Sequence, residues 1–243
     1  MMKTQQISAN LAQLTRLKMV NCYLVREADG FTLIDTGMSG SADAILKAAQ
    51  QLGAPIVRIA LTHPHSDHVG SLDALHAALP NAEVSISARD ARFLAGDMRL
   101  DADEPQDKLR GGFPQVTTRP DRLLAAGDRV GSLEVVAAPG HTPGHVAFFD
   151  TRDGTLIAGD AFYTIGGVTV TSVMRWRFPL PYMATWSKPR ALQSARVLRA
   201  LNPTRLAIGH GKVIDQPAGA IDAAIREAAG KLGEVGDGAR QRA

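Results

Sequence analysis

Cysteine is almost absent from this chain. Cys22 is the only one, so the chain can form neither an internal disulfide nor a cysteine-rich zinc knuckle. With 243 residues, 45% of them hydrophobic, the chain can bury a large core without such crosslinks. We expect Cys22 to pack as a small apolar side chain within a strand. The composition therefore indicates an ordinary globular fold.

Long hydrophobic runs and concentrations of one charge are absent as well. No segment approaches the length needed to span a bilayer, and the first ten residues lack the apolar core of a signal peptide. The net charge of +3 is small, and Lys and Arg are scattered among the acidic residues. Nucleic-acid-binding proteins usually carry a concentrated basic face. We therefore expect a cytoplasmic protein that binds neither membranes nor nucleic acids.

A serine-nucleophile motif is missing too, since no Gly-x-Ser-x-Gly sequence occurs. The chain has instead a string of metal-seeking side chains at residues 62–68, Thr-His-Pro-His-Ser-Asp-His. An apolar, β-branched run over 56–61 predicts a strand before this string, and helical spacing over 69–79 predicts a helix after it. The string therefore lies in a strand-to-helix loop, where rigid flanks can aim side chains at one point.

The spacing within this string indicates two metal positions. Pro64 favours extended backbone at His63, so His63 and His65 can project to the same side and share one metal. Asp67 and His68 follow as the chain turns into the helix, and they point toward a second position nearby. A lone His-x-His would be weak evidence, whereas the whole string is a specific metal-binding pattern.

Further candidate ligands follow three later apolar runs. Each lies near a glycine, which lets the backbone come close to a buried site: His141, Asp160 and His210. Taken singly, such residues are more often turn formers or capping groups. Together with the first string, they supply five histidines and two aspartates, which is enough for two zinc-like ions.

In this order, the candidate ligands resemble those of the metallo-β-lactamase superfamily of metallohydrolases. The resemblance extends over most of the chain, from the hairpin that ends at Asp35 to the Gly-His-Gly motif around His210. It implies an α/β (α+β) fold, a four-layer αββα sandwich, with the active site at one edge of its two sheets. We expect residues 1–243 to form one such domain, with a flexible tail over 232–243.

The resemblance also assigns the ligands to two divalent metal ions, with Zn²⁺ favoured and iron, manganese or cobalt as alternatives. Asp35 matches an aspartate that supports the metal site from behind, and His145 is expected to have a structural or supporting role. The implied ligands are His63, His65 and His141 for the first metal, Asp67, His68 and His210 for the second, and Asp160 as a bridge between both.

Two such cations about 3.5–4 Å apart can share a water, lower its pKa to near neutrality and hold a bridging hydroxide ready for attack. Asp67 is the ligand expected to orient this nucleophile and accept its proton. Tyr163 stands three residues after Asp160. Acyl-homoserine lactonases of this superfamily place a tyrosine similarly, where its hydroxyl can bind the substrate. A packed core tyrosine is the alternative interpretation.

Aromatic residues make up only 5% of the chain, yet half of them fall between 161 and 186. One interpretation is a core edge or a dimer contact, which would make the protein a homodimer. The other is an apolar wall over the metal site, suited to the acyl portion of a small-molecule substrate. The irregular stretch 97–120 could then form the opposite rim. The wall candidates are Phe162, Trp176, Phe178, Tyr182 and Trp186.

Hydrophobic periodicity and turn signals predict the remaining elements. These are a hairpin over 17–26 and 31–35, helices over 43–52, 88–95, 189–201 and 217–231, and strands over 83–86, 128–138, 146–150, 155–158 and 205–208.

The sequence therefore predicts a dinuclear metal-dependent hydrolase of ester or lactone bonds, of the acyl-homoserine lactone type. Thioester hydrolysis of the glyoxalase II type is the close alternative, although only 33 residues follow His210, where those enzymes carry a longer basic helical region. A mononuclear iron persulfide dioxygenase is an alternative from another enzyme class. A non-catalytic module that keeps metal for stability is the third.

Overall fold

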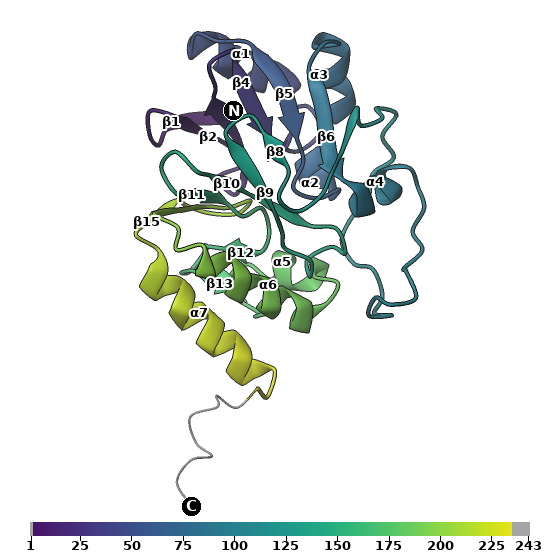
Figure 1. Cartoon of the computed structure of the whole chain (residues 1–243), viewed down its shortest axis with the longest axis vertical. Coiled ribbons are helices and arrows are strands. Elements are labelled where there is room, and N and C mark those ends of the chain that lie inside the picture. Colours follow the sequence, from purple (N-terminus) through teal and green to yellow (C-terminus); the bar gives the residue numbers. More distant parts are fainter. Residues whose placement is uncertain (1, 235–243) are drawn as a thin grey trace, which may run out of the picture.

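The computed structural model describes residues 2–234, and over this range the chain forms two large β-sheets (Figure 1). The strands of the first sheet follow chain order, antiparallel up to β4 and parallel from β4 to β7. They are β1 (Met2–Gln6), β2 (Leu11–Arg16), β3 (Val20–Arg26), β4 (Phe31–Ile34), β5 (Ile56–Ala60), β6 (Glu83–Ser87) and β7 (Arg122–Leu124).

The second sheet has the strand order β15-β14-β11-β10-β9-β8 and is parallel only between β11 and β14. A short ribbon of β12 and β13 lies apart from it in the pairing. These strands are β8 (Arg129–Val130), β9 (Leu133–Ala137), β10 (Val146–Asp150), β11 (Thr155–Ile157), β12 (Phe162–Tyr163), β13 (Thr169–Val170), β14 (Arg205–Ala207) and β15 (Ile214–Asp215).

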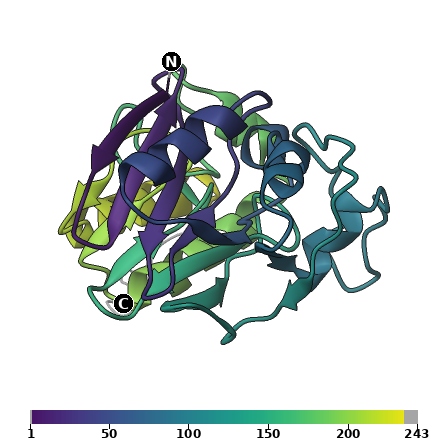
Figure 2. The ribbon, with the colours of Figure 1, turned by 90° about the horizontal axis from the view of Figure 1, so that it is seen from above.

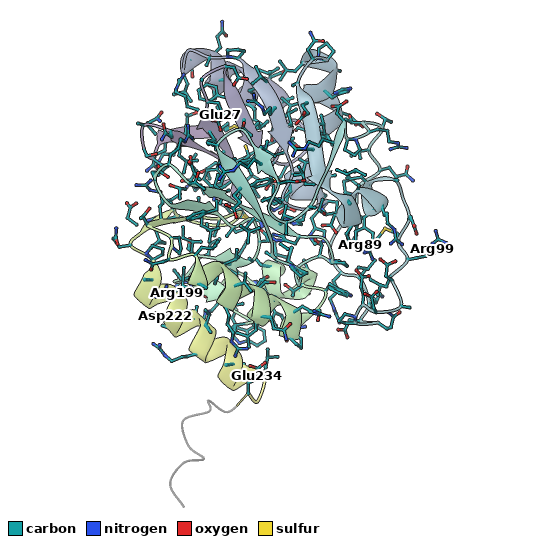
Figure 3. The ribbon with its side chains drawn as sticks, in the orientation of Figure 1. Glu27, Arg89, Arg99, Arg199, Asp222 and Glu234 are labelled. Atoms are coloured by element: carbon teal, nitrogen blue, oxygen red, sulfur yellow. The ribbon has the colours of Figure 1, made fainter. Side chains whose placement is uncertain are left out.

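Helices cover the outer faces of both sheets, as Figures 1 and 2 show. α1 and α3 lie on the first sheet, and α6 and α7 lie on the second, where Arg199 of α6 pairs with Asp222 of α7 at 2.7 Å (Figure 3). The helices are α1 (Ala42–Gln51), α2 (Ser66–Val69), α3 (Leu72–Ala78), α4 (Ala88–Leu94), α5 (Leu180–Ala184), α6 (Lys188–Ala200) and α7 (Ala218–Lys231).

The side chains of each strand alternate between the two faces of its sheet. In β3, Tyr23 and Val25 belong to the apolar cluster between the sheets, whereas Cys22 and Leu24 belong to the cluster that includes α1 and α3. A third cluster joins the second sheet to α6 and α7. Three apolar interfaces separate four layers, so the predicted αββα sandwich and the buried position of Cys22 are confirmed.

Three element predictions are corrected by the structure. β1 and β2 are absent from the prediction. β1 is polar and largely exposed and carries no apolar alternation, whereas β2 is mostly buried although its apolar residues are interrupted by Gln13 and Thr15. Most of the predicted helix over 69–79 is α3, whereas Val69 ends the short helix α2. Between them, Ser71 has a non-helical backbone (φ −110°, ψ 13°), and Gly70 packs so closely that a Cβ would lie 2.5 Å from the backbone nitrogen of Ser39. The predicted strand over 128–138 is the hairpin of β8 and β9, with Gly131 in the left-handed region at its turn.

The segment between Asp160 and α6, which shows no periodicity, folds as β12, β13 and α5. The predicted flexible tail over 232–243 falls mostly outside the described residues, which end at 234. Within residues 2–234, no helix combines the length and the apolar character needed to cross a bilayer.

Candidate metal centre

The predicted ligands meet at one edge of the two sheets. His63 follows β5 and Asp35 follows β4, and these strands are parallel neighbours. Asp160 and His210 follow β11 and β14, which are parallel neighbours in the second sheet. Because the carboxyl ends of parallel strands open on the same edge of a sheet, the topology gathers these side chains within each sheet. The packing of the two sheets then joins the two pairs.

Three histidines form the first group. The ligand atoms of His63, His65 and His141 lie within 4.8 Å of one another, and His65 Nδ1 is 3.0 Å from His141 Nε2. All three rings are buried. Burial lowers the pKa of each imidazole, to about 4 for His65, so the three rings are neutral at pH 7. Neutral imidazole is the form that binds metal ions.

Asp67, His68 and His210 form the second group, again within 4.8 Å of one another. Asp160 lies between the two groups. Its Oδ2 is 3.0 Å from His210 Nε2 and 3.4 Å from His141 Nε2, and its Oδ1 is 3.4 Å from His68 Nε2. One carboxylate thus faces ligands of both groups, which is the arrangement that a bridging ligand requires.

Negative charge concentrates on the side of the second group. Burial alone would lower the pKa of His210, but the carboxylates of Asp160 and Asp67 outweigh it and raise this pKa to about 10. Burial would likewise raise the pKa of Asp160, yet His210 and His68 hold it well below its usual range. These carboxylates therefore favour a positive charge beside them. A divalent cation can supply that charge in place of the protons on His68 and His210.

Each histidine of the two groups uses its second ring nitrogen in a contact that turns the other nitrogen inward. A proton on the outward nitrogen leaves the inward lone pair free for a metal. The outward contacts join His63 to Thr62 Oγ1 (3.0 Å), His65 to the Arg110 carbonyl (2.9 Å), His68 to Asp35 Oδ2 (2.8 Å), His141 to Thr185 Oγ1 (3.1 Å) and His210 to the Met19 carbonyl (3.0 Å).

Several inward atoms have no hydrogen-bond partner. His63 Nε2, His68 Nε2 and Asp160 Oδ1 are buried and unpaired among the residues that the structure describes. A buried polar atom left without a partner costs about 1–3 kcal/mol. These three side chains form a further group of ligand atoms within 4.8 Å of one another. Nitrogen and carboxylate donors in this arrangement fit a pair of divalent metal ions.

Asp35 lies behind the second group. Its carboxylate accepts hydrogen bonds from the backbone N–H and the hydroxyl of Thr62, both at 2.8 Å, and contacts His68 Nδ1 at 2.8 Å. Its backbone adopts φ +60°, a left-handed conformation that turns the chain at the end of β4. His145 lies behind Asp160, whose backbone N–H donates to His145 Nε2 at 3.1 Å. Both residues therefore occupy supporting positions.

A cleft of about 400 Å³ opens over the ligands. Asp67 is the most open ligand, with 31% of its side chain exposed. Gly111 and Gly112 of the 97–120 segment form one rim, and a Cβ at Gly111 would lie 2.3 Å from the His65 ring. Apart from Ser66, the remaining lining is apolar and comes from the turn before β3 and the first residue of β3, the loop after β4, and the region of α5: Leu17, Met19, Val20, Met38, Phe178, Leu180, Pro181, Met183 and Ala184.

The predicted aromatic wall is therefore wrong except at Phe178. Phe162 packs in the core under α6 and α7, and Trp176 is 88% exposed outside the cleft. Tyr182 lies under the ammonium group of Lys188, and Trp186 is buried and donates its indole N–H to the Asp107 carbonyl at 3.1 Å. Aliphatic and thioether side chains take the place of the rings because the turn before β3 and α5 reach the cleft mouth.

The structure also corrects the expected role of Tyr163. Its ring is buried against Phe178, and its hydroxyl donates to the Val173 carbonyl at 2.8 Å. We expect Tyr163→Phe to leave kcat and KM within about twofold of wild type, while the lost hydrogen bond lowers the free energy of unfolding by about 1 kcal/mol. Steady-state kinetics and chemical denaturation check this. A tenfold fall in kcat at unchanged stability would restore the catalytic role.

Sequence comparison finds a matching family and several relatives over most of the chain. A profile of the metallo-beta-lactamase superfamily matches residues 15–210, a range that contains all seven candidate ligands. The chain is 49% identical over 210 residues to the uncharacterized protein YobT of Bacillus subtilis (strain 168), covering 86% of this chain and 90% of that protein. It is 30% identical over 218 residues to the probable metallo-hydrolase YflN of the same strain, covering 80% and 81%.

Other matches either cover less of the matched protein or are less identical to this chain in sequence. The hydroxyacylglutathione hydrolase of Rhodospirillum rubrum is 33% identical over 150 residues, which is 59% of this chain and 48% of that protein. Among solved structures, the di-iron-bound form of TTHA1623 has a TM-score of 0.62 at 29% identity, covering 84% of this chain and 93% of that one. A metallo-beta-lactamase from Pontibacter korlensis reaches 0.71 at 18% identity, covering 93% and 99%, and shares the fold.

Proposed function

Because this chain belongs to the metallo-beta-lactamase superfamily, we propose that it is a dinuclear metal-dependent hydrolase of carboxylic ester or lactone bonds. The observation that carries the proposal is the convergence of seven candidate ligand side chains, five of which line one cleft. The similarity to YflN and to the di-iron form of TTHA1623 supports a two-metal hydrolase. When bound, such a pair of ions supplies Lewis acidity, lowering the pKa of water and polarising a carbonyl oxygen.

The chain's own residues would have distinct tasks. Asp67 faces the cleft, with its Oδ2 3.3 Å from His210 Nε2 of the second group, and its carboxylate would orient a water and accept its proton. Asp35 keeps His68 turned inward. The first ion would be held by His63, His65 and His141, the second by Asp67, His68 and His210, and both by Asp160.

The substrate class is proposed from the lining of the cleft. Its mouth carries the apolar residues Leu17, Leu180 and Met183, each of which is more than half exposed to water. A flexible acyl chain would cover these side chains while its carbonyl group approaches the ligands below. Methionine and leucine adapt to different chain shapes, so a range of aliphatic acyl groups fits such a cleft.

We expect kcat/KM to rise with acyl chain length in a series of p-nitrophenyl esters. Each buried methylene contributes about 0.8 kcal/mol, which is roughly fourfold per carbon until the chain outgrows the cleft. Leu180→Ser should flatten this dependence, because Leu180 lines the mouth. Trp176→Ser is the matched control, since Trp176 is exposed in the same segment but outside the lining. Equal rates for acetyl and octanoyl esters would rule out an apolar acyl site.

The test of the function itself combines metal analysis with a substrate panel. Purified protein should contain two metal ions per chain and should hydrolyse acyl lactones or p-nitrophenyl esters. S-lactoylglutathione belongs in the panel, because the similarity to a hydroxyacylglutathione hydrolase favours a thioesterase as the second candidate. One iron per chain with oxygen uptake on glutathione persulfide would identify a dioxygenase instead and overturn the proposal.

A further inference from the structure

One buried carboxylate near the site belongs to neither metal group. Asp90 lies on α4, is fully buried, and accepts two hydrogen bonds. Its Oδ2 accepts from Thr142 Oγ1 at 2.5 Å, and its Oδ1 accepts from the Gly144 backbone N–H at 2.7 Å. A buried carboxylate is costly unless its oxygens are paired, so these two contacts determine where the Thr142–Gly144 loop can lie.

This loop connects two residues of the metal centre. Thr142 directly follows His141, a ligand of the first group, and Gly144 directly precedes His145, which supports Asp160. The contact is close enough to require glycine, because a Cβ at Gly144 would lie 2.6 Å from the backbone nitrogen of Asp90. The loop and α4 therefore hold each other in a single relative position.

α4 reaches the other end of the first group as well. Phe93 packs against Phe113 with ring centroids 5.3 Å apart, and Phe113 packs against His65 at 4.8 Å. On its outer side, α4 contacts the 97–120 segment, since Arg89, labelled in Figure 3, donates to Glu104 at 2.7 Å. Arg92 donates to Asp101 at 2.6 Å. α4 thus contacts the segment that carries one rim of the cleft, and it reaches the surroundings of two first-group histidines, His65 through Phe113 and His141 through the loop that follows it.

We propose that Asp90 is a positioning residue for the first metal: by holding Thr142 and Gly144, it fixes the loop that presents His141. The proposal rests on the two-metal site of the proposed function. Burial raises the pKa of Asp90 to about 7, yet both of its contacts are donated by the loop and favour the ionised carboxylate. Residues that orient metal ligands typically contribute 10–100-fold to metal affinity.

The test is a metal titration against a chromophoric chelator, which needs no substrate. In Asp90→Asn, one of the two metal equivalents should bind 10–100-fold more weakly, and the other should bind as in wild type. The metal-binding curve of Asp90→Asn should resemble that of His141→Ala with a smaller loss of affinity. It should not resemble the curve of His210→Ala. Asp121→Asn is the matched control, because Asp121 also accepts a backbone N–H, from Val84 at 2.8 Å, but away from the site. Its two affinities should stay unchanged.

A second pair of variants covers the case in which Asp90→Asn does not fold. Thr142→Val keeps the shape of the side chain but loses the donor, and should weaken the same equivalent about tenfold. Thr142→Ser keeps the donor and should bind like wild type. Wild-type affinity for both equivalents in Thr142→Val, or equal weakening of both, would overturn the proposal. A protein that binds two metals in this pattern but hydrolyses no substrate of the panel would refute only the proposed function.

Discussion

Removing the metals should reduce ester and lactone hydrolysis to the uncatalysed background, and adding them back should restore it. No other nucleophile stands ready among the described residues. Cys22 is buried in the first sheet, and burial raises the pKa of its thiol far above the usual range. No serine hydroxyl hydrogen-bonds a histidine in residues 2–234, so the cleft offers no serine–histidine pair.

The measurement is residual activity after dialysis against a chelator, with metal content determined on the same sample. Protein dialysed without chelator is the control. Stability should fall together with activity, because ions present at 1,000 times their dissociation constant stabilise a protein by about 4 kcal/mol. For a chain of this size that corresponds to roughly 10 °C in the melting temperature. Full activity after complete removal of metal contradicts the proposed function.

Replacing Asp160 with asparagine should have the second largest effect, a loss of about 10³-fold in kcat/KM with one metal ion lost per chain. A ligand that faces both groups stabilises two cations, and each such ion is worth several kcal/mol of transition-state stabilisation. The asparagine would keep the shape of the side chain but lose its charge. Its amide would also direct N–H groups at imidazole nitrogens that must face a cation, among them His141 Nε2, which lies 3.4 Å from the native carboxylate.

Asp153→Asn is the control for this variant. Asp153 stands at the opposite end of β11, where it accepts the Thr155 N–H at 3.0 Å and lies 3.6 Å from Arg205. Its replacement should change stability slightly and leave kcat/KM and metal content unchanged. If Asp160→Asn retains both ions and more than a tenth of wild-type activity, Asp160 does not bridge them.

The ligand set could be predicted from sequence because its signals are local. Four of the seven ligands lie within residues 63–68, and the other three follow short apolar runs beside glycines. The string at 63–68, Asp160 and His210 each follow a strand. These strands, β5, β11 and β14, are short and largely buried, so they stand out in the sequence as short apolar runs. The αββα layers are implied by the resemblance of the candidate ligands to those of the metallo-β-lactamase superfamily. That resemblance does not depend on single element boundaries, so the fold class is correct where some of those boundaries are not.

The walls of the cleft could not be predicted, because they depend on contacts between distant segments. In the sequence, Phe162 and Trp186 are candidates for the cleft wall. In the structure, Phe162 packs in the core, and Trp186 is buried with its indole N–H donated to the Asp107 carbonyl. Leu17 and Met19 fall within the strand predicted over 17–26, whereas the structure places them in the turn before β3. In the sequence, nothing distinguishes Asp90 from an ordinary aspartate on a helix. Its two hydrogen bonds become visible only in the structure, where α4 packs on the loop after His141.

The floor and the walls of the cleft come from separate stretches of the chain. The candidate ligands lie in the loops after strands and in α2, whereas the apolar lining comes mainly from the turn before β3 and from the region of α5. Exchange of a leucine or methionine in those two stretches would change the shape of the cleft without moving a ligand. Preference for one substrate over another can therefore diverge among close relatives while the reaction that they catalyse stays the same.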